Sequence, residues 1–147
     1  MVVRLSAGLV ALVALAVAPL PARAVADAGA PVLIQTPGVL CAVSANDVPR
    51  GGGPTVACQL NDGGPFPQAP FSTTKPNPKM NLAVVRGGGQ FQWEYGSVSG
   101  GQPITLAPGQ TYHVNGWTID SAEARSTYAY GDAAHGFWIG PNFVHPN

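Results

Sequence analysis

Hydrophobic and polar residues alternate most regularly in residues 90–95, which read Gln-Phe-Gln-Trp-Glu-Tyr. Successive side chains of a strand point to opposite faces, so this pattern predicts a half-buried strand. Phe91, Trp93 and Tyr95 share one face and are expected to pack in the core. Glu94 lies on the other face and is expected to point into solvent.

Short runs of the same kind recur along the chain, separated by glycine and proline. Further strands are predicted at 32–35, 40–44, 55–60, 82–86, 104–106, 111–120, 126–130 and 136–144. Residues 61–79 hold five prolines and a Gly-Gly pair, which predicts an extended loop that Phe66 and Phe71 pin to the body. About seven to nine such strands predict an all-β fold, a small antiparallel sandwich or barrel with long Gly/Pro-rich loops.

Two turn signals fall inside these predicted strands. Asn115-Gly116 is a strong two-residue hairpin signal, and a hairpin would place Tyr112 and Trp117 on one face. The competing interpretation is a continuous strand with the glycine at a close contact. Gly140-Pro141 predicts a bulge or kink in the last strand.

The first residues have the pattern of a secretory signal peptide. Arg4 precedes an unbroken apolar run over residues 7–18, and Ala22-Arg23-Ala24 fits the cleavage rule for small residues. An uncleaved anchor is the alternative, but a membrane span needs roughly 20 apolar residues. We expect cleavage after Ala24, with Ala26 as a second candidate, which leaves residues 25–147 as a single secreted β-domain.

Two cysteines, Cys41 and Cys58, would then reach an oxidising compartment, where paired cysteines usually bridge. If Cys41 faces Cys58 across an antiparallel pair, Val43 faces Val56 and residues 46–54 form the hairpin loop. A catalytic pair is the alternative, but the sequence has no C-x-x-C spacing. The pattern therefore predicts a structural disulfide between Cys41 and Cys58.

Charge narrows the choice of partners. Charged residues make up only 10% of the chain. Five basic and seven acidic residues remain from residue 25 onward, a net charge of −2. This balance gives no electrostatic attraction to nucleic acid or to anionic lipid. We therefore expect no nucleic-acid partner, and no membrane span after signal cleavage.

Four short motifs occur in order along the chain. They are Thr36-Pro37-Gly38 before Cys41, Gly109-Gln110-Thr111-Tyr112, Gly116-Trp117-Thr118-Ile119 and Ala134-His135-Gly136-Phe137. Together they resemble small secreted actinobacterial, mycobacterial-type proteins of unknown function. This chain lacks the serine of the first motif, has Ala134 where a glycine is expected, and lacks the second cysteine pair of some relatives. The resemblance implies a continuous strand through Asn115-Gly116 with the turn at residues 120–125, and it carries over no functional residue.

Catalytic and metal chemistry have little support in the sequence. The three histidines, His113, His135 and His145, share no metal-ligand spacing, so we expect no metal and no cofactor. No G-x-S-x-G motif is present. The alternative function is a small hydrolase centred on His135, with Glu94 or Asp120 as its carboxylate.

Aromatic residues provide the leading hypothesis. Phe137 and Trp138 are adjacent, so a strand must point them to opposite faces and one of them is a candidate for surface contact. The candidate binding residues are Tyr128, Tyr130, His135 and Trp138. Exposed aromatic rings on a β-surface stack on sugars or anchor a protein partner. The sequence thus favours a non-enzymatic binding protein that contacts envelope glycan or a protein partner.

Overall fold

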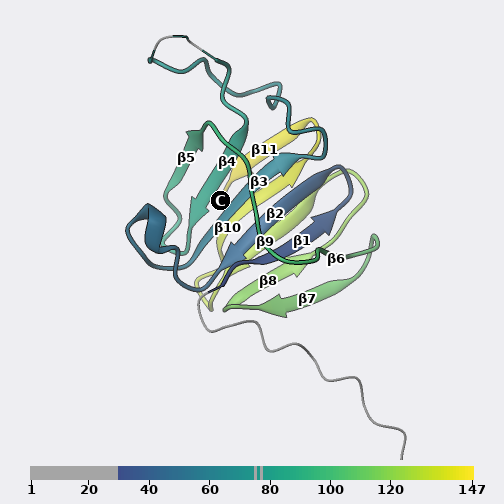
Figure 1. Ribbon diagram of the computed structural model, residues 1–147. Helices are drawn as coiled ribbons and strands as arrows, with labels where there is room; N and C mark the ends of the chain where they lie inside the picture. Colours follow the sequence, from purple (N-terminus) through teal and green to yellow (C-terminus); the bar gives the residue numbers. More distant parts are fainter. Residues whose placement is uncertain (1–29, 75, 77) are drawn as a thin grey trace, which may run out of the picture.

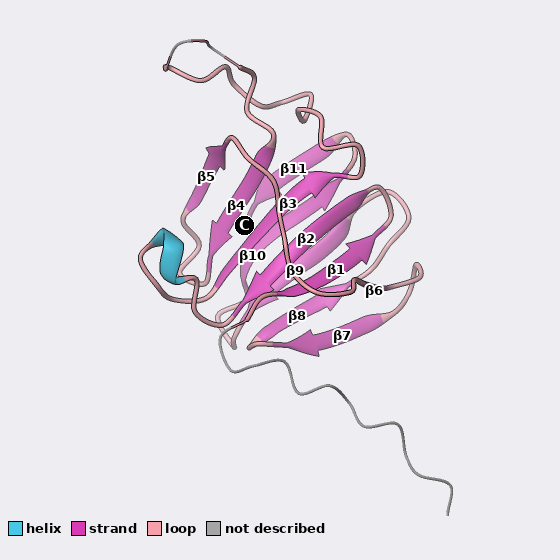
Figure 2. Ribbon diagram, viewed as in Figure 1, coloured by secondary structure: helices cyan, strands magenta, loops and turns pink. Residues whose placement is uncertain are grey.

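The computed structural model describes residues 30–147 except residues 75 and 77, and it shows two β-sheets packed face to face (Figures 1 and 2). The predicted all-β fold is confirmed, and the arrangement is a sandwich. The predicted signal peptide, residues 1–24, lies outside the described residues. Within the described range, no helix has both the length and the apolar character of a membrane span.

The first sheet has six strands in the order β5-β4-β3-β2-β1-β6. Their bounds are β1 Val32–Thr36, β2 Val39–Ser44, β3 Thr55–Leu60, β4 Leu82–Arg86, β5 Phe91–Glu94 and β6 Ile104–Thr105. Strands β1 to β5 form an antiparallel meander, and β6 pairs with β1 in parallel. A short 3₁₀ helix, η1 (Val48–Arg50), lies in the loop between β2 and β3.

The second sheet is an antiparallel meander of five strands in the order β11-β10-β9-β8-β7. Their bounds are β7 Thr111–Val114, β8 Trp117–Asp120, β9 Ser126–Tyr130, β10 His135–Gly140 and β11 Phe143–Pro146. Alternate residues of both sheets point between them and form one core. The largest fully buried side chains there include Ile34, Val43, Val85, Trp117, Ile119, Tyr128, Phe137 and Ile139.

The cysteine hairpin has the predicted register. Cys41 of β2 is opposite Cys58 of β3, and Val43 is opposite Val56. The two sulfurs are bonded at 2.06 Å. All four side chains are fully buried, so the disulfide links the two central strands of the first sheet from inside the core.

The outer face of the first sheet is covered by residues 95–103, which we call the strap. The strap runs from β5 at one edge of the sheet across to β6 at the other (Figure 1). Val98 packs over a second apolar cluster formed by Ala57, Leu82 and Val84. Its amide donates a hydrogen bond to Gln59 Oε1 at 2.9 Å. The strap explains why β4 is buried on both faces.

Two predictions about the last strands are wrong. Asn115-Gly116 does not lie within a continuous strand; it is the turn of the β7–β8 hairpin. Both residues have positive φ, 53° and 81°, as a type I′ turn requires. Gly140-Pro141 is likewise not a kink, because the chain reverses there between β10 and β11. The predicted turn after Asp120 is confirmed.

Two further expectations fail at the ends of elements. Strand β5 stops at Glu94, so Tyr95 leaves the sheet and is 65% exposed rather than buried. In the Pro-rich loop, Phe66 is fully buried as predicted, but Phe71 is 67% exposed. Gln68 anchors the loop instead, through hydrogen bonds between its side-chain amide and the backbone of Val144.

Candidate binding surface

Strand β10 sorts its aromatic residues between the two sides of the second sheet. Phe137 and Ile139 point into the core and are buried. Trp138, between them, points outward and is 37% exposed. The predicted opposition of Phe137 and Trp138 is thus confirmed, and Trp138 is the residue that faces solvent.

Trp138 belongs to a cluster of flat side chains on this outer face. It pairs with His145 of β11, and the two ring centroids are 5.8 Å apart. The Phe143 ring stacks on His145 at 6.0 Å. The guanidinium carbon of Arg125 lies 4.8 Å from the Trp138 centroid and 5.4 Å from that of Phe143. We call these four residues the Trp138 surface.

The Trp138 surface combines an aromatic face with hydrogen-bond donors. The cation–π contacts hold Arg125 and Trp138 in place before any ligand arrives. Among the described residues, Arg125 forms no side-chain hydrogen bond or ion pair, so its N–H groups are available to a ligand. Thr127 of β9 lies opposite Trp138 and adds a hydroxyl beside it.

Tyr128, predicted as a binding residue, points from β9 into the core. It is fully buried among the core residues, and its hydroxyl shares a hydrogen bond of 3.3 Å with Thr36 Oγ1. Burial raises the pKa of Tyr128 well above its ordinary value of 10.0, and the hydrogen bond to Thr36 opposes this only in part. Alternation along β9 sends Tyr128 inward, so its ring is not at the surface.

Tyr130 also faces inward and does not join the Trp138 surface. It is half-buried, and its ring packs on Trp117 at 5.2 Å between centroids. A Cβ atom added at Gly116 would lie 2.6 Å from its Cε2 atom. Tyr130 therefore packs against the β7–β8 turn, apart from the Trp138 surface.

His135 is exposed at the start of β10. Its ring forms no hydrogen bond or ion pair with any described residue. The two carboxylates of the hydrolase hypothesis lie elsewhere: Asp120 accepts a hydrogen bond from Thr111, and Glu94 pairs with Arg50 on the opposite sheet. Neither carboxylate contacts His135 through a hydrogen bond or an ion pair. Within the described range, no three His, Cys, Asp or Glu residues lie close enough to hold a metal ion.

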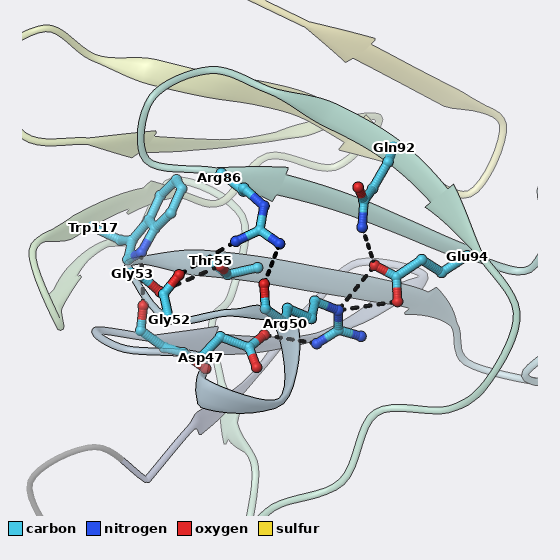
Figure 3. A network of polar contacts seen from close by, with 10 residues as sticks. Asp47, Arg50, Gly52, Gly53, Thr55, Arg86, Gln92, Glu94 and Trp117 are labelled. Atoms are coloured by element: carbon cyan, nitrogen blue, oxygen red, sulfur yellow. Dashed lines mark hydrogen bonds and ion pairs between the residues drawn. The ribbon is translucent and has the colours of Figure 1, made fainter.

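Glu94 is not solvated as expected, because it pairs with Arg50 (Figure 3). Arg50 Nε donates to both Glu94 oxygens at 3.0 and 2.9 Å, and Nη1 donates to Asp47 at 2.7 Å. Arg86 donates to the carbonyls of Arg50 and Gly52. Burial lowers the pKa of Arg50, but the hydrogen bonds and charges of Glu94 and Asp47 outweigh it, so this pKa is raised.

This network fixes the η1 loop against the outer face of the first sheet. The two carboxylates are 44 and 3 residues away from Arg50 in sequence. The sequence contains one signal for this network: the alternation in β5, which turns Glu94 outward.

Comparisons of this chain with protein-family models, with curated proteins and with solved structures find no match in any of the three. We therefore infer the function from the chemistry of the molecular surface. Of the four binding residues predicted from the sequence, Trp138 and His135 are exposed, and Trp138 alone lies in a cluster of aromatic and cationic groups.

Proposed function

We propose that this protein is a secreted, non-enzymatic binding module whose Trp138 surface contacts glycan of the cell envelope. The observation that carries the proposal is the exposed Trp138 ring on a sheet face, next to His145 and Phe143 and held by Arg125. An indole ring supplies a flat apolar face for the C–H side of a sugar, and the guanidinium supplies donors for its hydroxyls.

The composition of the same face favours a glycan over a protein partner. Stable protein interfaces bury about 1,200–2,000 Å² and centre on contiguous apolar clusters. Among the described residues, the large exposed hydrophobic side chains are Val48, Phe71, Tyr95 and Trp138, and only Trp138 lies on the outer face of the second sheet. One exposed indole and the half-buried Phe143 ring, among hydroxyl, imidazole and guanidinium groups, suit a polar ligand with small apolar faces.

Secretion is supported by two observations. The predicted signal peptide provides the route, and the Cys41–Cys58 disulfide is of the kind that persists in oxidising compartments. The resemblance to small secreted actinobacterial proteins agrees with this location. No specific observation favours the hydrolase alternative, because Asp120 and Glu94 bond other residues than His135.

A glycan array tests the proposal with a matched pair of variants. Trp138→Ala removes the ring from the Trp138 surface, whereas Tyr95→Ala removes a more exposed ring that lies beyond β5. We expect the unmodified protein and Tyr95→Ala to retain the same glycans. Trp138→Ala is expected to bind at least about tenfold more weakly, as for a central aromatic contact. Retention of no glycan, or equal retention by all three proteins, would refute the proposal.

A further inference from the structure

A pocket of about 160 Å³ opens on the outer face of the first sheet, the face opposite the Trp138 surface. Its floor includes Ala42 of β2 and Ala57 of β3, whose side chains point away from the core. The η1 loop forms one wall with Asp47 and Arg50, and residues 97–99 of the strap form the other. We call it the strap pocket.

The strap pocket is lined by hydrogen-bonding groups that the described part of the chain leaves unused. The hydroxyl of Ser44, a residue only 5% exposed, forms no hydrogen bond with a described residue. Asp47, 8% exposed, uses Oδ2 to bind Arg50, and no described residue donates to its Oδ1. Arg50 uses Nε and Nη1 (Figure 3), whereas its Nη2 donates to no described residue.

These unused groups are open to the pocket rather than sealed in the protein. Within the described range, no side-chain nitrogen or oxygen that is cut off from solvent lacks a hydrogen-bond partner. The free oxygens of Ser44 and Asp47 are therefore reached by solvent, although both residues are nearly buried. The hydroxyls of Ser97 and Ser99 add further donors and acceptors from the strap.

The charges around the strap pocket are balanced, which selects against ionic ligands. Asp47 and Glu94 both pair with the Arg50 guanidinium. The Arg86 guanidinium binds the backbone of the same loop, so two negative charges meet two positive ones and no net attraction is left for a phosphate. The Arg50 guanidinium repels a metal cation from Asp47. A neutral ligand that both donates and accepts hydrogen bonds fits this wall best.

We propose that the strap pocket binds a neutral, polyhydroxylated ligand the size of one sugar ring. Pockets for drug-sized molecules have volumes of about 300–1,000 Å³, and the strap pocket is smaller than this range. The ligand is therefore a single ring or one terminal residue of a chain. The methyl groups of Ala42 and Ala57 face the apolar side of that ring, and Ser44, Asp47 and Arg50 bind its hydroxyls. This site does not depend on the Trp138 surface, since the two lie on opposite sheets.

Nuclear magnetic resonance titration tests the proposal. D-glucose, D-galactose, D-mannose and myo-inositol are added separately to the purified protein, with sodium phosphate and calcium chloride as ionic probes. We expect at least one neutral probe to shift the amide signals of Val98 and Ser99 saturably, with a Kd of about 1–10 mM for so small a ligand. The ionic probes are expected to leave these signals unchanged.

Three variants locate the site. Ala42→Leu fills the floor and should abolish the shifts, whereas Ala129→Leu, at a half-buried outward position of β9, should leave them intact. Ser44→Ala removes one hydroxyl without adding volume and should weaken binding about three- to tenfold. If Ala42→Leu does not fold, Ser44→Ala alone tests whether the ligand binds in the strap pocket. Trp138→Ala should change nothing. The proposal is overturned if no neutral probe acts, if phosphate or calcium gives the same shifts, or if folded Ala42→Leu or Ser44→Ala binds normally.

Discussion

At the scale of single residues, direction on a strand decides which aromatic side chain is available to a ligand. Trp138 could be predicted, because two adjacent bulky residues in a strand must face opposite sides. Tyr128 could not, because nothing local distinguishes the inner from the outer face of β9 until both sheets are placed. Glu94 shows the same limit: alternation turned it outward, but its partner Arg50 comes from a distant loop.

The buried hydroxyl of Tyr128 makes the unfolding free energy of the protein fall at alkaline pH. Because burial raises the pKa of folded Tyr128 above 10.0, the unfolded chain releases a proton above about pH 10 that the folded protein retains. The stabilising contribution is complete below that pH and declines above it by about 1.4 kcal/mol per pH unit. Urea unfolding of the wild type and of Tyr128→Phe, from pH 8 to about 11.5, measures how the unfolding free energy of each depends on pH. If the unfolding free energies of the wild type and of Tyr128→Phe change with pH in parallel, the raised pKa of Tyr128 is contradicted.

At the scale of elements, strands were predictable where alternation and turn residues agreed. The cysteine hairpin shows this best, because one register satisfies both the sulfur pair and the apolar face. The β7–β8 hairpin shows the converse. The turn chemistry of Asn115-Gly116 indicated it correctly, and the continuous strand implied by a resemblance between short motifs was wrong. Local backbone physics was the better guide there.

The type I′ turn can be tested with a pair of glycine substitutions. Gly116→Ala places a Cβ atom 2.6 Å from Tyr130 Cε2 at a φ of 81°, so we expect a loss of at least about 1 kcal/mol in unfolding free energy. Gly101→Ala is the control, because no atom lies within 4 Å of the added Cβ and its φ is outside the left-handed region. It should change stability by less than about 0.5 kcal/mol. Thermal and urea unfolding that rank the two variants equally would exclude this turn.

Removal of the disulfide should destabilise the first sheet substantially. Cys41→Ala combined with Cys58→Ala releases a link across 17 residues, which corresponds to about 3 kcal/mol in the chain-entropy model. Urea unfolding of the double variant, beside the unmodified protein with and without reductant, measures the loss. A double variant as stable as the oxidised protein would show that the link does not brace the fold.

At the scale of the whole molecule, the sandwich separates two chemically different outer faces. The strap crosses the first sheet (Figure 1), whereas Trp138 is exposed on the second. Sequence patterns predicted the all-β class but not this division. The parallel pairing of β6 with β1 and the course of the strap depend on contacts between distant residues, and alternation along a single strand contains no information on them.

The three tryptophans allow the central claim to be tested within one spectrum. Trp117 is buried, with its indole N–H bonded to the Ser44 carbonyl, and Trp93 is half-buried beside Phe66, whereas Trp138 is exposed. A soluble oligosaccharide retained on the array is titrated into ¹⁵N-labelled protein, and Trp138→Ala assigns the signal of the exposed indole. We predict that the Trp138 indole signal shifts saturably while the Trp117 signal stays in place. A saturable shift of Trp117 or Trp93 without Trp138, or no shift at all, would contradict binding at the Trp138 surface.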